Sequence, residues 1–125
     1  MLAVIAICVG ACLGALARWQ LSVHFNAHPA MPLGTLYANL IGGYLIGVCM
    51  AVFQALPQLD PAWRLLLVTG FLGALTTFSS FSSEVVQMLM AGRHAQALLT
   101  ASLHVLGSLL CTLAGLKSVE WLGWR

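Results

Sequence analysis

Three hydrogen-bonding side chains are spaced four residues apart near the end of the chain. His104, Ser108 and Thr112 stand in an otherwise apolar stretch, and this spacing places side chains on one face of a helix. Asn39 also lies among apolar residues, and its amide brings two N–H donors that cost about 1–3 kcal/mol if they are buried without partners. A stripe covering two helical turns favours a pathway for a small solute more than one polar residue would.

Residues 70–84 combine two glycines, six hydroxyl side chains and a carboxylate. At membrane depth such groups are costly if they face lipid. Gly73 with the pair Thr76 and Thr77 suits a break in a helix, where freed carbonyls and amides face the centre of a bundle. The alternative is an unbroken helix whose Thr hydroxyls bond to the preceding turn, and the residue types alone do not separate the two.

Phe78 and Phe81 are three residues apart and share a helix face, with Ser79 and Ser80 between them. An aromatic ring has an electropositive edge that can attract an anion. The alternative is a pair of core aromatics with incidental serines.

Two charged residues complete the set of polar candidates. Arg18 comes late in the first apolar stretch, where it can concentrate anions at an entrance or extend its side chain to the membrane surface. Glu84 is the one carboxylate expected in the interior. Because amides, hydroxyls and ring edges are donors or electropositive surfaces, the candidate ligand is an anion.

The elements that position these residues are expected to be membrane-spanning helices. Of the 125 residues, 61% are hydrophobic and 6% are charged, whereas soluble domains have about 25% charged residues. A span needs about 20 apolar residues, so the length suits four helices. The sequence predicts an all-α integral membrane protein with a single transmembrane domain over residues 1–125. The expected spans are residues 2–25, 33–55, 63–90 and 95–116.

Several features suit these spans. Trp63 with Arg64, and Trp121 with Trp124 and Arg125, are expected to anchor helix ends at the membrane surface. The glycine pairs 10/14 and 43/47 are expected to let helices pack closely. Residues 2–17 resemble the apolar part of a signal peptide, but no basic residue precedes them, so we expect a retained first span.

The basic residues are divided almost evenly between the two sides of the membrane. Arg64, Lys117 and Arg125 would lie on one side, and Arg18 and Arg93 on the other. Since the asymmetry of basic residues orients a membrane protein, this chain is expected to insert in both orientations and to form an antiparallel homodimer. The alternative is that the weak bias suffices for one orientation.

The composition excludes other classes of function. The five basic residues are scattered, so no nucleic-acid-binding patch is expected. Cys8, Cys12, Cys49 and Cys111 lie in apolar stretches, and we interpret them as packing residues rather than disulfide or metal ligands. No catalytic or nucleotide-binding motif is present, so no enzyme activity is predicted.

Three motifs resemble those of the CrcB/Fluc family of fluoride channels. They are GACLGALARW at 10–19, GTLYANLIG at 34–42 and GFLGALTTFSSF at 70–81. The match covers nearly the whole chain, and the third motif is the most specific.

The resemblance implies a dual-topology homodimer in a bacterial inner membrane that exports fluoride passively through two pores. It implies a structural sodium ion at the dimer centre, bound by the carbonyls of Gly73 and Thr76 where the third span breaks. At position 104, where relatives often have tyrosine, this chain has histidine, so proton-dependent behaviour becomes possible. The pore residues implied by the resemblance are Asn39, Phe78, Phe81, Ser79, Ser80, His104, Ser108 and Thr112, with Arg18 and Glu84 in the vestibule.

Two other functions remain open at this point. A small proton-coupled drug exporter has a similar size, but it needs a carboxylate within the first span, and this chain has none there. A non-conducting scaffold protein is the second alternative.

Overall fold

The computed structural model describes residues 1–26 and 31–123, and every element in this part of the chain is helical. Its four long helical segments are each apolar and long enough to cross a membrane, which confirms the predicted all-α architecture of four spans. In chain order the elements are α1 (Leu2–Phe25), α2 (Leu33–Ala55), α3 (Pro61–Arg64), η1 (Leu65–Leu72), α4 (Gly73–Leu75), α5 (Phe78–Met90) and α6 (His94–Trp121).

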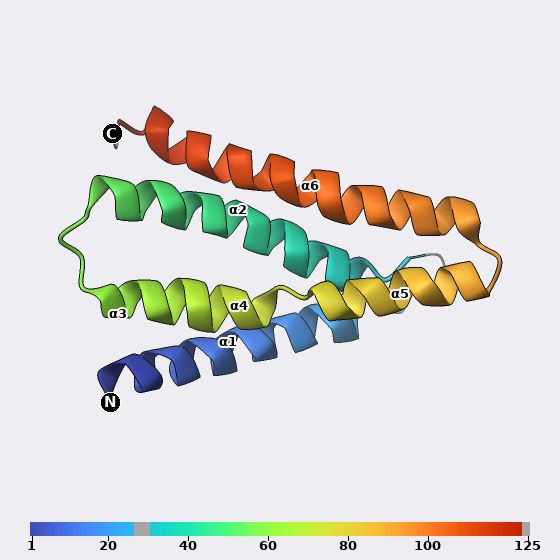
Figure 1. The fold of residues 1–125 in the computed structure, drawn as a ribbon, viewed down its shortest axis with the longest axis horizontal. Helices are drawn as coiled ribbons and strands as arrows, with labels where there is room; N and C mark the ends of the chain where they lie inside the picture. Colours follow the sequence, from blue (N-terminus) through green and yellow to red (C-terminus); the bar gives the residue numbers. More distant parts are fainter. Residues whose placement is uncertain (27–30, 124–125) are drawn as a thin grey trace.

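The four spans lie side by side as a bundle (Figure 1). Helix α2 packs most extensively on α6, and α1 packs on η1 and α4. The fully apolar core is small and centres on Ala38, Leu72 and Leu75. Large aliphatic side chains such as Leu16 and Leu110 point outward, as expected where lipid surrounds the bundle.

Small residues let the helix backbones approach one another, as the glycine pairs predicted. A Cβ atom at Gly10 would overlap the carbonyl oxygen of Leu66, and one at Gly14 would overlap that of Phe71. A Cβ atom at Gly47 would overlap the Thr112 carbonyl oxygen of α6. These contacts fix which faces of the helices meet and therefore which polar groups come together.

The third span is interrupted, which decides between the two alternatives for residues 70–84. Asp60 caps its start by accepting a hydrogen bond from the Ala62 amide at 2.8 Å. The helix widens to π-helical geometry in η1 and ends after α4, and Thr76 and Thr77 have extended backbones (ψ 154° and 119°). Helix α5 then restarts, with the Thr77 hydroxyl accepting from the Ser80 amide at 3.1 Å.

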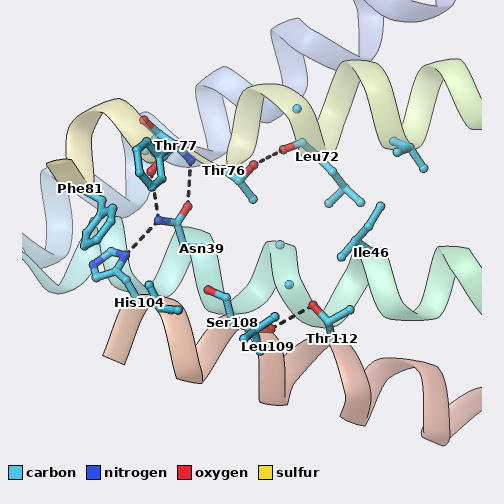
Figure 2. A pocket seen from close by; sticks show the side chains of 16 residues that line it. Asn39, Ile46, Leu72, Thr76, Thr77, Phe81, His104, Ser108, Leu109 and Thr112 are labelled. Atoms are coloured by element: carbon cyan, nitrogen blue, oxygen red, sulfur yellow. Dashed lines mark hydrogen bonds between the residues drawn. The ribbon is translucent and has the colours of Figure 1, made fainter. Parts of the chain in front are cut away.

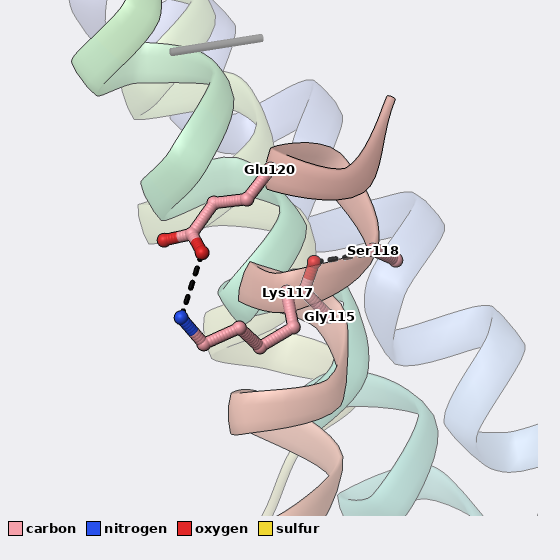
Figure 3. Close-up of polar contacts among 4 residues, drawn as sticks. All are labelled: Gly115, Lys117, Ser118 and Glu120. Atoms are coloured by element: carbon pink, nitrogen blue, oxygen red, sulfur yellow. Dashed lines mark hydrogen bonds and ion pairs between the residues drawn. The ribbon is translucent and has the colours of Figure 1, made fainter. Parts of the chain in front are cut away.

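The fourth helix is longer than predicted, because its polar last turns remain helical to Trp121 rather than ending near Leu116. Lys117 and Glu120 form an ion pair at 2.7 Å, and Ser118 donates to the Gly115 carbonyl at 2.7 Å (Figure 3). Side-chain pairs three apart support a helical turn. Trp121 is exposed, whereas Trp124 and Arg125 lie outside the described residues.

Candidate functional site

A cavity of about 530 Å³ lies between α2, the interrupted third span and α6 (Figure 2). Most of its wall is apolar, and polar groups are contributed by each of the three spans. Six of the eight predicted pore residues line it, as do both predicted sodium ligands. The lining residues are Asn39, Gly42, Gly43, Ile46, Val68, Leu72, Gly73, Thr76, Thr77, Phe78, Phe81, His104, Val105, Ser108, Leu109 and Thr112.

Asn39 is at the centre of a hydrogen-bond network that joins all three spans (Figure 2). Its Oδ1 accepts from the Thr77 amide at 2.8 Å, and its Nδ2 donates to the Thr77 carbonyl at 3.1 Å. The same Nδ2 lies 3.0 Å from His104 Nδ1. Both amide hydrogens of Asn39 therefore have partners, so in this arrangement Asn39 holds the helix break and His104 in place rather than offering a free donor.

The break frees the carbonyl groups that the resemblance assigns to a sodium ion. In a continuous helix the Thr77 amide would bond to the Gly73 carbonyl and the Ser80 amide to the Thr76 carbonyl. Here these two amides bond instead to Asn39 Oδ1 and to the Thr77 hydroxyl. Carbonyl oxygens without helical donors are suitable ligands for a hard cation.

Arg18 lies against the same break. Its Nε donates to the Ala74 carbonyl at 3.0 Å, and its side chain is half-buried. This bond ties α1 to α4 and neutralises part of the negative end of the broken helix. The predicted vestibule role of Arg18 remains a prediction.

Three rings are arranged along one wall of the site. Phe78 and Phe81 meet edge to face with centroids 5.4 Å apart, and Phe81 stacks on His104 at 4.5 Å with an interplanar angle of 23°. Phe81 and His104 are only 9% and 4% exposed, whereas Phe78 is 77% exposed. The buried rings of Phe81 and His104 thus form the inner wall of the cavity. At the exposed Phe78 the cavity opens to the surface of the single chain.

Ser108 and Thr112 of α6 line the cavity one and two turns after His104. The Thr112 hydroxyl donates to the Ser108 carbonyl at 2.9 Å, one turn earlier on the same helix. In this rotamer Thr112 therefore presents oxygen lone pairs rather than a proton, and Ser108 is the hydroxyl better placed to donate.

Ser79, Ser80 and Glu84 do not line the cavity. The hydroxyls of Ser79 and Ser80 lie 3.2 and 3.1 Å from Thr77 Oγ1, at the start of α5. Glu84 Oε1 accepts from the Thr35 hydroxyl at 2.5 Å. Their predicted roles in a pore and a vestibule stay predictions.

Thr77 contributes to the site but was absent from the predicted pore residues. It supplies both backbone groups that hold Asn39, and the paired threonines were a signal for it. Thr35 is buried at 3% exposure and bonds to Glu84, outside the cavity.

The four cysteines are free thiols, and Cys8 and Cys12 are exposed rather than packed within the chain. Among the residues that the structure describes, no three His, Cys, Asp or Glu side chains come together as a metal site. Any bound metal in this region would depend on backbone or hydroxyl oxygens.

The sequence was also compared with those of known proteins. Residues 5–116 match the family model described as CrcB-like protein, Camphor Resistance. A protein of Albidiferax ferrireducens named "Fluoride-specific ion channel FluC" is 66% identical over 122 residues, covering 98% of this chain and 94% of the relative. Relatives with the same name from Variovorax paradoxus and Pseudomonas putida are 62% and 55% identical over 120 and 122 residues, covering 96% and 97% of this chain and 96% of each relative. The resemblance seen in the three motifs is confirmed: the chain belongs to the CrcB family.

Proposed function

We propose that this protein is a fluoride-selective channel that lets the ion leave the cell passively. The observation that carries the proposal is the cavity at the helix break, in which hydrogen-bonding groups from three spans meet inside an apolar wall. The relatives' names support fluoride as the ion. The direct test is the release of fluoride and chloride from liposomes that contain the purified protein.

The arrangement suits a small, strongly hydrated anion. Such an ion crosses the bilayer only if donors replace its water in several weak steps, so that it can enter and also leave. Ser108 and the ring edges at Phe78 and Phe81 provide such steps along the cavity. A larger halide has lower charge density, gains less from each donor and fits less well between the rings.

We also propose that the working form is an antiparallel homodimer with two pores. The cavity-lining residues Phe78 and Gly73 are exposed in the single chain, so one chain leaves the wall incomplete. A hydrated anion would be unstable where that opening meets lipid, and a second copy of the same surface would close it. Two-fold symmetry gives each copy an equivalent cavity, hence two pores.

Because the basic residues are nearly balanced between the two sides, we expect copies of the chain to insert in both orientations. Each end of the bundle would then face the outside of the cell in some of the copies. In a background without the four natural cysteines, single cysteines would replace Gln58, between α2 and α3, and Ala91, between α5 and α6. Each should be labelled to about half by an impermeant thiol reagent in whole cells, because copies insert both ways. Complete labelling of one position with none at the other would contradict the antiparallel arrangement.

A structural sodium ion at the dimer centre is the final part of the proposal. The carbonyl oxygens of Gly73 and Thr76 have lost their helical donors, and both residues line the open cavity. When bound, the ion would neutralise these carbonyl dipoles. In the chain itself, Arg18 holds the break at Ala74, between these two residues, and Asn39 holds it at Thr77, directly after them.

A further inference from the structure

Arg18 reaches the helix break from α1, and no described residue of α1 lines the cavity. Helix α1 packs on α4 (Figure 1), and a Cβ atom at Gly14 would overlap the carbonyl oxygen of Phe71. Arg18 follows Gly14 by one turn on the same face, so this close approach brings its side chain to the break. Its Nε then donates to the Ala74 carbonyl at 3.0 Å.

This bond occupies one carbonyl of the break and leaves its neighbours to a cation. The carbonyls of Gly73 and Thr76 have lost their helical donors, whereas Ala74, which lies between them, accepts from Arg18. A guanidinium group keeps its positive charge in proteins. The carbonyls proposed to bind sodium therefore have a fixed positive charge beside them.

The carboxylates of the chain do not offset this charge. There are three acidic residues, and none of them lines the cavity. Asp60 caps the start of the third span. Glu84 accepts from the Thr35 hydroxyl of α2, and Glu120 pairs with Lys117 near the end of α6. The cavity at the break therefore offers a cation only neutral oxygens.

Such a set of groups discriminates between cations by charge. Calcium sites in proteins take their affinity largely from carboxylates, which the break lacks. The repulsion between a fixed charge and an ion doubles when the charge of the ion doubles, and salt screens it less inside the bundle than at the surface. Sodium and calcium ions have nearly the same radius, so size does not separate them.

We propose that Arg18 makes the sodium site selective for singly charged cations. Its Nε–H group holds the Ala74 carbonyl toward α1 and so fixes the neighbouring carbonyls of Gly73 and Thr76. Its charge disfavours a divalent ion at those two carbonyls. This inference rests on the proposed sodium site, and it gives Arg18 a role distinct from the predicted concentration of anions in a vestibule.

Two substitutions separate the hydrogen bond of Arg18 from its charge. The amide nitrogen of glutamine is as many bonds from Cα as Nε of arginine, so Arg18→Gln keeps a donor for Ala74 and loses the charge. Arg18→Lys keeps the charge. The measurement is the thermal unfolding midpoint in the chloride of a large organic cation, to which sodium or calcium chloride is added at constant ionic strength without fluoride.

The midpoints are compared at the concentration at which sodium gives half of its full effect. Calcium at this concentration should leave the midpoints of the wild type and of Arg18→Lys unchanged. In Arg18→Gln, calcium should raise the midpoint by at least about half as much as sodium does, because the repulsion is gone.

Two further variants serve as controls. Arg64→Gln removes an equal charge more than two helical turns before Ala74, so this variant should remain insensitive to calcium. Arg18→Met lacks both the charge and the donor. It should need at least about tenfold more sodium than Arg18→Gln for half of the effect, because the two variants differ only by the bond to Ala74.

The outcomes distinguish this inference from the proposals on which it rests. Calcium stabilisation of the wild type or of Arg18→Lys that equals the effect of sodium would overturn it, even if Arg18→Gln does not fold. A folded Arg18→Gln protein without a calcium response, or an equal response in Arg64→Gln, would also overturn it. A wild-type midpoint that does not depend on sodium would overturn the sodium site itself, whereas fluoride release from liposomes tests the channel separately.

Discussion

Replacing Asn39 with alanine is expected to lower fluoride release about 100-fold. The change removes the acceptor of the Thr77 amide and the donor to His104 Nδ1, and each lost bond of this kind costs about 1–3 kcal/mol, or about tenfold for each 1.4 kcal/mol. Without Asn39, the helix break and the imidazole no longer have fixed positions relative to each other. The measurement is the initial rate of fluoride release from liposomes at matched protein density.

The matched control is Ile41→Ala, a truncation on the exposed face of the same helix, which should leave the rate unchanged. Asn39→Asp serves as a second variant, because its carboxylate can still accept from the Thr77 amide and so preserve the break. It should also lose flux, since it has no N–H group and places a negative charge beside the path of an anion. Wild-type rates from well-folded Asn39→Ala and Asn39→Asp proteins would show that the network does not serve conduction.

Removal of sodium is expected to destabilise the protein strongly. An ion present at about 100 times its dissociation constant stabilises the folded form by about 2.7 kcal/mol. Replacing sodium with a large organic cation should therefore lower the thermal unfolding midpoint and shift the proposed dimer toward single chains. The measurement is thermal unfolding at increasing sodium concentration, with potassium at equal ionic strength as the comparison.

A pair of glycine substitutions tests where the sodium effect originates. A Cβ atom at Gly42 would collide with Thr76 Cγ2, so Gly42→Ala should displace Thr76 and weaken the dependence on sodium. A Cβ atom at Gly107 meets only the flexible end of Leu40 at 2.8 Å. Gly107→Ala should therefore retain the dependence of the unfolding midpoint on sodium. A midpoint that does not depend on sodium in the wild type would exclude a structural sodium ion.

The helices could be predicted closely from the sequence because each apolar run has about the length that a bilayer requires. The first two spans begin and end where predicted, at residues 2–25 and 33–55. The fourth was predicted to end at residue 116, just before the charged residues Lys117 and Glu120. Their side chains instead pair across one turn and continue the helix.

The site was predictable in its residue types but not in its internal contacts. Helical spacing placed His104 and Ser108 on one face, and both line the cavity. The bond between His104 and Asn39 depends on which faces of α2 and α6 meet, and the sequence spacing within one helix carries no information on that. Ser79 and Ser80 were assigned to the pore by proximity, but the helix restarts after the break with its own N-terminal cap, which engages both.

The most direct measurement of the central claim is fluoride release from liposomes reconstituted with the wild-type protein, recorded with a fluoride electrode while potassium and valinomycin balance the charge. Fluoride should leave rapidly once valinomycin is added, and chloride in parallel vesicles should stay inside. If protein-containing vesicles retain fluoride as long as protein-free vesicles do, the cavity at the helix break is not a fluoride pathway.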